Sequence, residues 1–280
     1  MADYRKMWED LGMDVEMHDQ LCAVLPQAFG DVFLSQENRP EGMDYYNMVV
    51  ADIHGIRPAE LIEHQKKGGK VFGTFCVYVP DEIVFAADAI ATGLCGGSQF
   101  WVPGGEKVLP TNTCPLIKAS VGARIDRTCP FFRIADMYVG ETTCDGKKKA
   151  WEILAEDVPV HVMNLPQMKR AKDVQAWAEE IETFKNIVEE FTGNKVTADK
   201  LAESIKLINN KRKALERLYD LRKNETLPIS GCDALLISQI AFYDDPARFT
   251  QMTNKLCDEL EKLSLIHISE PTRPEPISYA

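Results

Sequence analysis

The order of apolar and polar positions in the middle of the chain predicts short buried strands that alternate with helices. Continuous apolar runs suited to strands buried on both faces occur at 70–76, 98–102, 137–143 and 158–162. Helical patterns lie between them, from Pro80 through Ile90 to about Gly93, after Cys114, and at 147–155. Such alternation is typical of a parallel sheet. We therefore predict an α/β fold with a doubly wound parallel sheet of the Rossmann or flavodoxin type.

The pattern on either side of this region is different. Residues 1–66 are expected to form an N-terminal helical and irregular segment, and 67–166 the α/β domain. From Asp173 onward apolar residues recur at steps of three and four, up to Gly193, and again after Thr197. These two stripes predict a long helical hairpin within a helical region at 167–262, for which a structural role is the simplest interpretation.

The last part of the chain has an unusual composition. The segment LSLIHISEPTR, which begins at Leu263, resembles the translation of a sequencing adapter. We expect 263–280 to be a non-native tail, and we assign it no function.

Composition and charge narrow the possible functions. The chain has 280 residues, 45% of them hydrophobic, and a formal net charge of −11, which argues against nucleic acid as the main partner. It has no run of 18 apolar residues that would span a membrane, and its first residues lack the apolar core of a signal peptide. We therefore expect a cytoplasmic protein with no membrane partner. Eight cysteines in a reducing compartment then indicate metal binding, redox chemistry or simple burial rather than disulfides.

Four cysteines stand at positions that suit metal binding. Cys76 ends the first predicted strand, and Cys144 follows the strand at 137–143 and precedes three lysines. Cys114 and Cys129 are each followed by proline, which favours the first position of a helix. A helix N-terminus and nearby cations favour the thiolate, the form that binds metal. Because ligands gather beyond the carboxyl ends of parallel strands, Cys76 and Cys144 are candidates for one site.

Burial or a different metal could also account for these cysteines. Free cysteines are often small buried hydrophobic residues, and zinc is the rival metal. The tight Cys-x-x-Cys pairs of structural zinc sites are missing, and so are the short ferredoxin spacings. We favour an iron–sulfur site that the fold assembles from Cys76, Cys114, Cys129 and Cys144.

Other polar residues are weaker candidates. Glu82, in the first turn of a predicted helix, is the best acid or base, although it could equally be a helix-start carboxylate without a chemical role. Lys147 and Lys148 could hold an anionic substrate group or balance the charge of a reduced cluster, or could be solvated. Three histidines lack a partner at ligand spacing and are expected to be structural: His54, His64 and His161.

Several of these motifs together resemble a known family. They are Gly73-Thr74-Phe75-Cys76 with Pro80-Asp81-Glu82, Cys114-Pro115-Leu116-Ile117-Lys118, Cys129-Pro130-Phe131, and Gly140-Glu141-Thr142-Thr143-Cys144-Asp145-Gly146-Lys147-Lys148-Lys149. The chain resembles the 2-hydroxyacyl-CoA dehydratase and benzoyl-CoA reductase superfamily, D-component type. It looks most like the branch of double-cubane-cluster anaerobic reductases. The resemblance is close from about 71 to 165 and loose over the helical hairpin.

The resemblance implies an oxygen-sensitive iron–sulfur protein, with a 4Fe–4S or a double-cubane 8Fe–9S cluster. A separate ATP-hydrolysing iron–sulfur activator would supply low-potential electrons, and a homodimer and a small-molecule or acyl-CoA substrate are further expectations. Cys114 and Cys144 would be ligands in both branches, and Cys129 and Cys76 would be added for the larger cluster. Glu82 falls where the dehydratases carry an acidic active-site residue.

One departure from the family pattern limits these expectations. Members of the family carry a second α/β domain with further cysteine ligands, and this sequence lacks it. We therefore expect the chain alone to hold no complete cluster and to be inactive.

Three functions thus compete at this stage. The first is an anaerobic reductase of the double-cubane type, which Cys129 favours. The second is a D-component subunit of a 2-hydroxyacyl-CoA dehydratase. The third is a non-catalytic domain with zinc-binding or structural cysteines.

Overall fold

The computed structural model describes residues 4–37, 39–94, 96–223 and 227–264. They form two compact units, which we describe separately. The sheet unit comprises Met1–Pro26 and Asp52–Lys206, and the helical unit comprises Gln27–Ala51 and the chain from Leu207 onward. None of the described helices is both long and apolar enough to cross a lipid bilayer.

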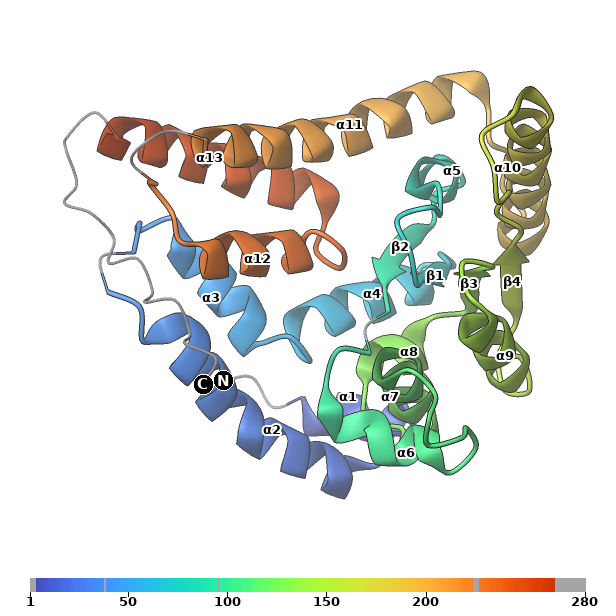
Figure 1. Cartoon of the computed structure of the whole chain (residues 1–280), viewed down its shortest axis with the longest axis horizontal. Coiled ribbons are helices and arrows are strands. Elements are labelled where there is room, and N and C mark those ends of the chain that lie inside the picture. The colour runs from blue at the N-terminus through green and yellow to red at the C-terminus, as the bar shows by residue number, and fades with distance from the viewer. Residues whose placement is uncertain (1–3, 38, 95, 224–226, 265–280) are drawn as a thin grey trace. The chain divides into compact units, whose positions relative to one another are not determined.

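The sheet unit is built on four parallel strands (Figure 1). They are β1 (Val71–Thr74), β2 (Ile90–Gly93), β3 (Met137–Glu141) and β4 (Val160–Met163). Their order in the sheet is β2-β1-β3-β4, so the two central strands are β1 and β3. The register pairs Phe72 with Met137 and Tyr138 with Val160. The predicted parallel α/β architecture is confirmed.

Helices cover both faces of this sheet, as a doubly wound fold requires. Alternate side chains of a strand point to opposite faces, and β3 shows the division. Val139 packs in a cluster with α5 (Asp81–Ala86) and α10 (Ala171–Thr192). On the other face the hydroxyl of Tyr138 donates a hydrogen bond to Phe132 in α8 (Pro130–Ile134), and Gly140 lies against Trp151 of α9 (Asp145–Leu154).

The predicted helix that starts at Pro80 is present but ends before the expected Gly93, and the predicted strand at 98–102 is wrong. Helix α5 stops at Ala86, because Asp88 adopts a left-handed φ of 56°, and the chain then enters β2 beside β1. The segment expected to be the next strand forms a 3₁₀ turn, η2 (Gln99–Trp101), and helix α6 (Val102–Glu106). Packing on a neighbouring helix outweighs the strand preference of its Phe-Trp-Val run.

That neighbour is α7 (Pro115–Ile125), which lies against η2 and α6 at backbone distance. A Cβ atom at Gly105 would lie 2.0 Å from the carbonyl oxygen of Lys118, and one at Gly122 would lie 1.9 Å from that of Trp101. Only glycine fits at these crossings. The close packing fixes where α7 begins, and therefore where Cys114 lies.

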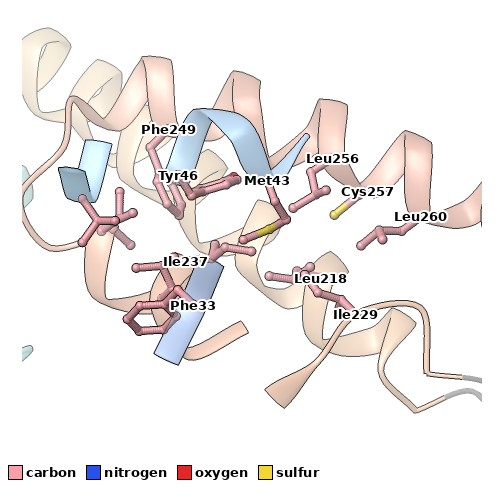
Figure 2. Close-up of a cluster of buried hydrophobic side chains, with 14 residues drawn as sticks. Phe33, Met43, Tyr46, Leu218, Ile229, Ile237, Phe249, Leu256, Cys257 and Leu260 are labelled. Carbon is pink, nitrogen blue, oxygen red and sulfur yellow. The ribbon is translucent and has the colours of Figure 1, made fainter. Parts of the chain in front are cut away.

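The N-terminal segment is helical, as predicted, and contributes to both units. Its elements are α1 (Arg5–Asp10), α2 (Val15–Phe29), the π-helical turn η1 (Gly30–Leu34), α3 (Met43–Ala51) and α4 (Ile56–Lys66). In the helical unit, α3 packs with α12 (Gly231–Ile240) and α13 (Pro246–Ser264). Figure 2 shows the buried core of this unit, which includes Met43, Tyr46, Phe249 and Leu256.

Helix α10 ends at Gly193, which has a left-handed φ of 74°, and α11 (Ala198–Leu221) follows. The apolar side chains along α11 pack into two different hydrophobic cores. Leu201 packs against the sheet cluster, whereas Leu215 and Leu218 belong to the core of the helical unit. Of the expected tail, 265–280 lies outside the described residues.

Candidate functional site

Two of the predicted cysteines follow the carboxyl ends of the two central strands. Strands β1 and β3 are parallel neighbours, and beyond the last β1 residue the amide of Phe75 still donates to the carbonyl of Val139 at 3.2 Å. Cys76 comes next in the chain and is half-buried. Cys144 comes three residues after β3 and is exposed. Both therefore lie at the edge of the sheet where ligands of such folds bind.

Three cysteines cap helices, as the sequence predicts. Cys114, Cys129 and Cys144 are the N-cap residues of α7, α8 and α9. The sulfur of Cys144 accepts a hydrogen bond from the amide of Lys147 at 3.4 Å. A helix N-terminus carries partial positive charge, so each of these sulfurs lies at the positive end of a helix dipole.

Cys114 and Cys144 cap two helices that pack against each other. Helix α7 contacts α9, and a Cβ atom at Gly146 would lie 2.8 Å from Cδ1 of Ile117. Gly146 and Ile117 lie in the first turns of their helices, so the contact is at the ends that carry the cysteines. Both thiols are exposed. The structure thus brings the starts of these two helices together.

The turn that carries Cys144 is held by Glu141, which sequence reasoning did not identify as important. The Glu141 side chain is 0% exposed, and its carboxylate accepts hydrogen bonds from the Thr143 amide at 2.7 Å and from the Lys147 ammonium. Burial acts to raise the pKa of Glu141, but the hydrogen bonds from Lys147 and Thr143 outweigh it and hold the pKa below its usual value. The only hint in the sequence is a carboxylate inside a buried strand followed by a lysine.

The two lysines predicted to bind an anion have different environments. Lys147 is paired with the buried Glu141, and its side chain is 21% exposed. Lys148 is paired with Asp145 at 3.2 Å and is 49% exposed. The ammonium of Lys147 is thus already engaged within the protein, whereas Lys148 is accessible from solvent. Their roles in binding an anion stay predictions.

Cys129 and Glu82 lie in other surroundings. Cys129 is 3% exposed and interacts electrostatically with Tyr138, whose pKa burial raises strongly. Glu82 is half-buried in the first turn of α5, on the opposite face of the sheet from α8 and α9. Along the chain, Glu82 comes after β1 and after the turn that contains Cys76. The assignment of both residues to a site stays a prediction.

The four predicted cysteines offer the sulfur donors that an iron–sulfur cluster takes. Within the described part of the chain, no three of Cys76, Cys114, Cys129 and Cys144 have sulfurs close enough to bind one ion. Each cysteine of a cluster binds a different iron, so cluster ligands lie farther apart than the ligands of one ion. Two exposed thiols at touching helix starts therefore fit part of a cluster site.

The pocket beside Cys114 is small. It has a volume of about 110 Å³ and lies between the 96–99 segment and the first residues of α7, including Pro115 and Leu116. Pockets for organic ligands usually measure about 300–1,000 Å³. This pocket is too small for an acyl-CoA.

Comparison with known proteins identifies the family. Residues 76–276 match the family described as 2-hydroxyglutaryl-CoA dehydratase, D-component. The chain belongs to this family. The matched region includes all four predicted cysteines, Glu82, Lys147 and Lys148. The sequence-based assignment to the 2-hydroxyacyl-CoA dehydratase superfamily is thereby confirmed.

Several relatives of this D-component chain are named as dehydratase or reductase subunits. YjiM of Escherichia coli, which is named provisionally as a dehydratase subunit, is 40% identical over 178 residues, or 63% of this chain and 46% of YjiM. A benzoyl-CoA reductase subunit of Thauera aromatica is 26% identical, over 60% of this chain and 44% of its own length. The beta subunit of (R)-2-hydroxyglutaryl-CoA dehydratase of Acidaminococcus fermentans is 22% identical, over 71% of this chain and 53% of its own length. The D-component chain thus spans about half the length of these relatives.

The structure gives His54 a partner that spacing along the sequence does not indicate. His54 does have a partner at ligand distance: its Nδ1 lies 2.8 Å from Nε2 of His18, and Cys22 is adjacent. The three residues precede the part of the chain that matches the D-component family. The spacing of His18 and Cys22, four positions apart on a helix, was available in the sequence. Their proximity to His54 was not.

Proposed function

We propose that this chain is the cluster-binding part of an iron–sulfur reductase of the double-cubane type. In this proposal an ATP-hydrolysing activator delivers low-potential electrons to the cluster, in a cytoplasmic and anaerobic setting. The observation that carries it is the pair of exposed thiols, Cys114 and Cys144, at the starts of two helices in contact. Bound there, the cluster would supply one-electron chemistry at low potential.

The residues of this chain would have defined roles. Cys114 and Cys144 would bind the cluster, and Cys76 and Cys129 would serve as further ligands of a double cubane. The Glu141–Lys147 pair would hold the turn of Cys144 in place. Glu82 would act on the substrate as an acid or base, and Lys148 would attract anionic groups.

A second candidate is a D-component subunit of a 2-hydroxyacyl-CoA dehydratase, which the names of the relatives favour. In either case the substrate site would be completed outside the described residues. Support comes from the small pocket beside Cys114 and from exposed apolar side chains next to the cysteines, Val77, Tyr78 and Leu116. A second α/β domain or a partner subunit would cover this face, and a homodimer remains part of the proposal.

Because the chain alone is expected to hold no complete cluster, the proposal is tested by anaerobic reconstitution with iron and sulfide after the expected second α/β domain has been restored. We expect bound iron and visible absorption, both greatly reduced in Cys114→Ala and Cys144→Ala and unchanged in Cys232→Ala, a matched control in the helical unit. If Cys129→Ala also lowers the iron content, the double cubane is favoured, whereas an unchanged content favours the single cluster of a dehydratase subunit. A colourless protein, or equal iron in all variants, would support the non-catalytic alternative.

A further inference from the structure

The sheet unit contains a second compact group of nitrogen and sulfur donors, which includes none of the four cysteines discussed above. Among the described residues, His18, Cys22 and His54 each offer one donor atom, and these three atoms lie within 4.8 Å of one another. His18 and Cys22 are one turn apart on α2, and His54 lies in the turn between α3 and α4. From these contacts we infer that His18, Cys22 and His54 bind a divalent transition-metal ion, with zinc the best fit.

The spacing of the donors is close to that of a tetrahedral zinc site. Zinc lies about 2.0–2.1 Å from histidine nitrogen and about 2.3 Å from cysteine sulfur, so tetrahedral geometry places nitrogen and sulfur ligands about 3.6 Å apart. Sγ of Cys22 lies 3.5 Å from Nε2 and 3.7 Å from Nδ1 of His18, so the sulfur is beside the imidazole ring, and the ring must turn before Nε2 and the sulfur can bind one ion. Two tetrahedral nitrogen ligands would be about 3.3 Å apart. The two imidazoles, whose nitrogens are 2.8 Å apart, need to separate by only about half an ångström.

The chemical state of the group suits a metal. Both histidines are buried, and the neutral imidazole is the form of histidine that binds a metal ion. One of the two rings donates the hydrogen bond between Nε2 of His18 and Nδ1 of His54. If that hydrogen moves to the other nitrogen of its own ring, both of these nitrogens have a free lone pair for a metal ion. Binding then releases a single proton, from the thiol of Cys22, and leaves one net positive charge at the site.

The surroundings hold the ligands in place while leaving access from solvent. Nε1 of Trp8 donates to the carbonyl of His54 at 2.9 Å, and the Trp8 ring lies 4.2 Å from the ring of His18. Cys22 is only half-buried, so an ion can enter from its side and keep a water molecule as fourth ligand. A mixed histidine and cysteine donor set suits zinc better than calcium or magnesium, which prefer oxygen.

Metal titration of the whole chain, after treatment with a chelator, tests the inference. With Co²⁺ as a spectroscopic probe we expect one ion per chain, a thiolate-to-cobalt charge-transfer band and release of a proton. With Zn²⁺ we expect a higher melting temperature. Cys22→Ser and His54→Asn should weaken binding by more than about a hundredfold, since changing merely an outer-shell partner costs about 10–100-fold.

Matched controls are His161→Gln and Cys232→Ser, which should bind like the unchanged chain. Cys22→His keeps a ligand, so it should retain bound cobalt but lose the charge-transfer band, even if Cys22→Ser does not fold. The inference is overturned if the unchanged chain binds no metal. It is also overturned if the binding is abolished by Cys114→Ala and Cys144→Ala but not by His54→Asn. The proposed cluster depends on Cys114 and Cys144, whereas the inferred metal ion depends on His18, Cys22 and His54. Failure of one proposal can therefore be distinguished from failure of the other.

Discussion

Replacement of Lys147 by methionine tests how the turn of Cys144 is held. The change removes the ammonium group that faces Glu141 and leaves a carboxylate that is 0% exposed with the Thr143 amide as its remaining donor. Removing one partner of a fully buried ion pair costs about 3–5 kcal/mol. Because the Lys147 side chain is 21% exposed, water can partly replace it, and we expect a loss of about 2–4 kcal/mol.

The adjacent lysine provides a matched control. Lys148 pairs with Asp145, and their side chains are 49% and 100% exposed. Lys148→Met removes the same charge one residue further along the same helix. Because exposed ion pairs contribute about 0–1 kcal/mol, this variant should be close to the unchanged chain in stability.

Hydrogen exchange of the peptides that cover 137–154 measures the local effect. A loss of about 2–4 kcal/mol corresponds to exchange that is about 30- to 1,000-fold faster, because each 1.4 kcal/mol is a factor of ten. Lys148→Met should change these rates by less than about fivefold. If the two variants exchange at the same rate, the buried pair does not stabilise this turn, and the structural role given to Lys147 is wrong.

The same pair predicts a dependence on pH. In the unchanged chain the pKa of Glu141 is lowered, so its contribution to stability is complete above the ordinary value of 4.5 and is lost as the pH falls through the lowered pKa. In Lys147→Met burial remains without the ammonium, so the pKa of Glu141 rises and the charged form becomes costly. The difference in urea stability between the two proteins should therefore be largest at about pH 7 and smaller at about pH 5. An equal difference at both pH values would contradict this account.

Two further substitutions, each with a matched control, test close packing in the sheet unit and a buried ion pair in the helical unit. Gly122→Ala would place a Cβ atom 1.9 Å from the backbone oxygen of Trp101, and we expect a loss of about 3 kcal/mol or more in thermal unfolding. Gly193→Ala, at a φ of 74° but in open space, should lose only about 1 kcal/mol. Arg39→Met removes the partner of Asp233, whose side chain is 2% exposed, and should cost about 3 kcal/mol in urea unfolding of the helical unit. Arg217→Met, in an exposed network, should cost less than about 1 kcal/mol.

The sequence predicts those parts of the site that depend on local rules. Proline after Cys114 and Cys129 predicts helix starts, and both cysteines are N-caps. The strand-turn-helix order around Cys144 is also correct, because its strand is buried on both faces and therefore continuously apolar.

Errors arise where contacts distant in sequence decide the structure. The apolar spacing of Ile83, Ala87 and Ile90 continues a helical pattern, but pairing with β1 makes Ile90 the first residue of a strand. The Phe-Trp-Val run at 100–102 has strand propensity, yet close backbone contacts at Gly105 and Gly122 hold this segment against α7. The His18–His54 contact joins residues from two helical segments, which no periodicity relates.

The inferred metal site is connected to the sheet through α4. His54 lies just before α4, and near the end of that helix Nε2 of Gln65 donates to the carbonyl of Ile134 at 2.8 Å and to Asp136 at 2.9 Å. The carboxylate of Asp136 also accepts from the amide of Val71 at 2.8 Å, at the start of β1. An ion that fixes His54 would therefore stabilise the segments that lead into β1 and β3, whose carboxyl ends carry Cys76 and Cys144. The histidine-containing site and the site of the four cysteines differ in donor chemistry, so one can be loaded without the other.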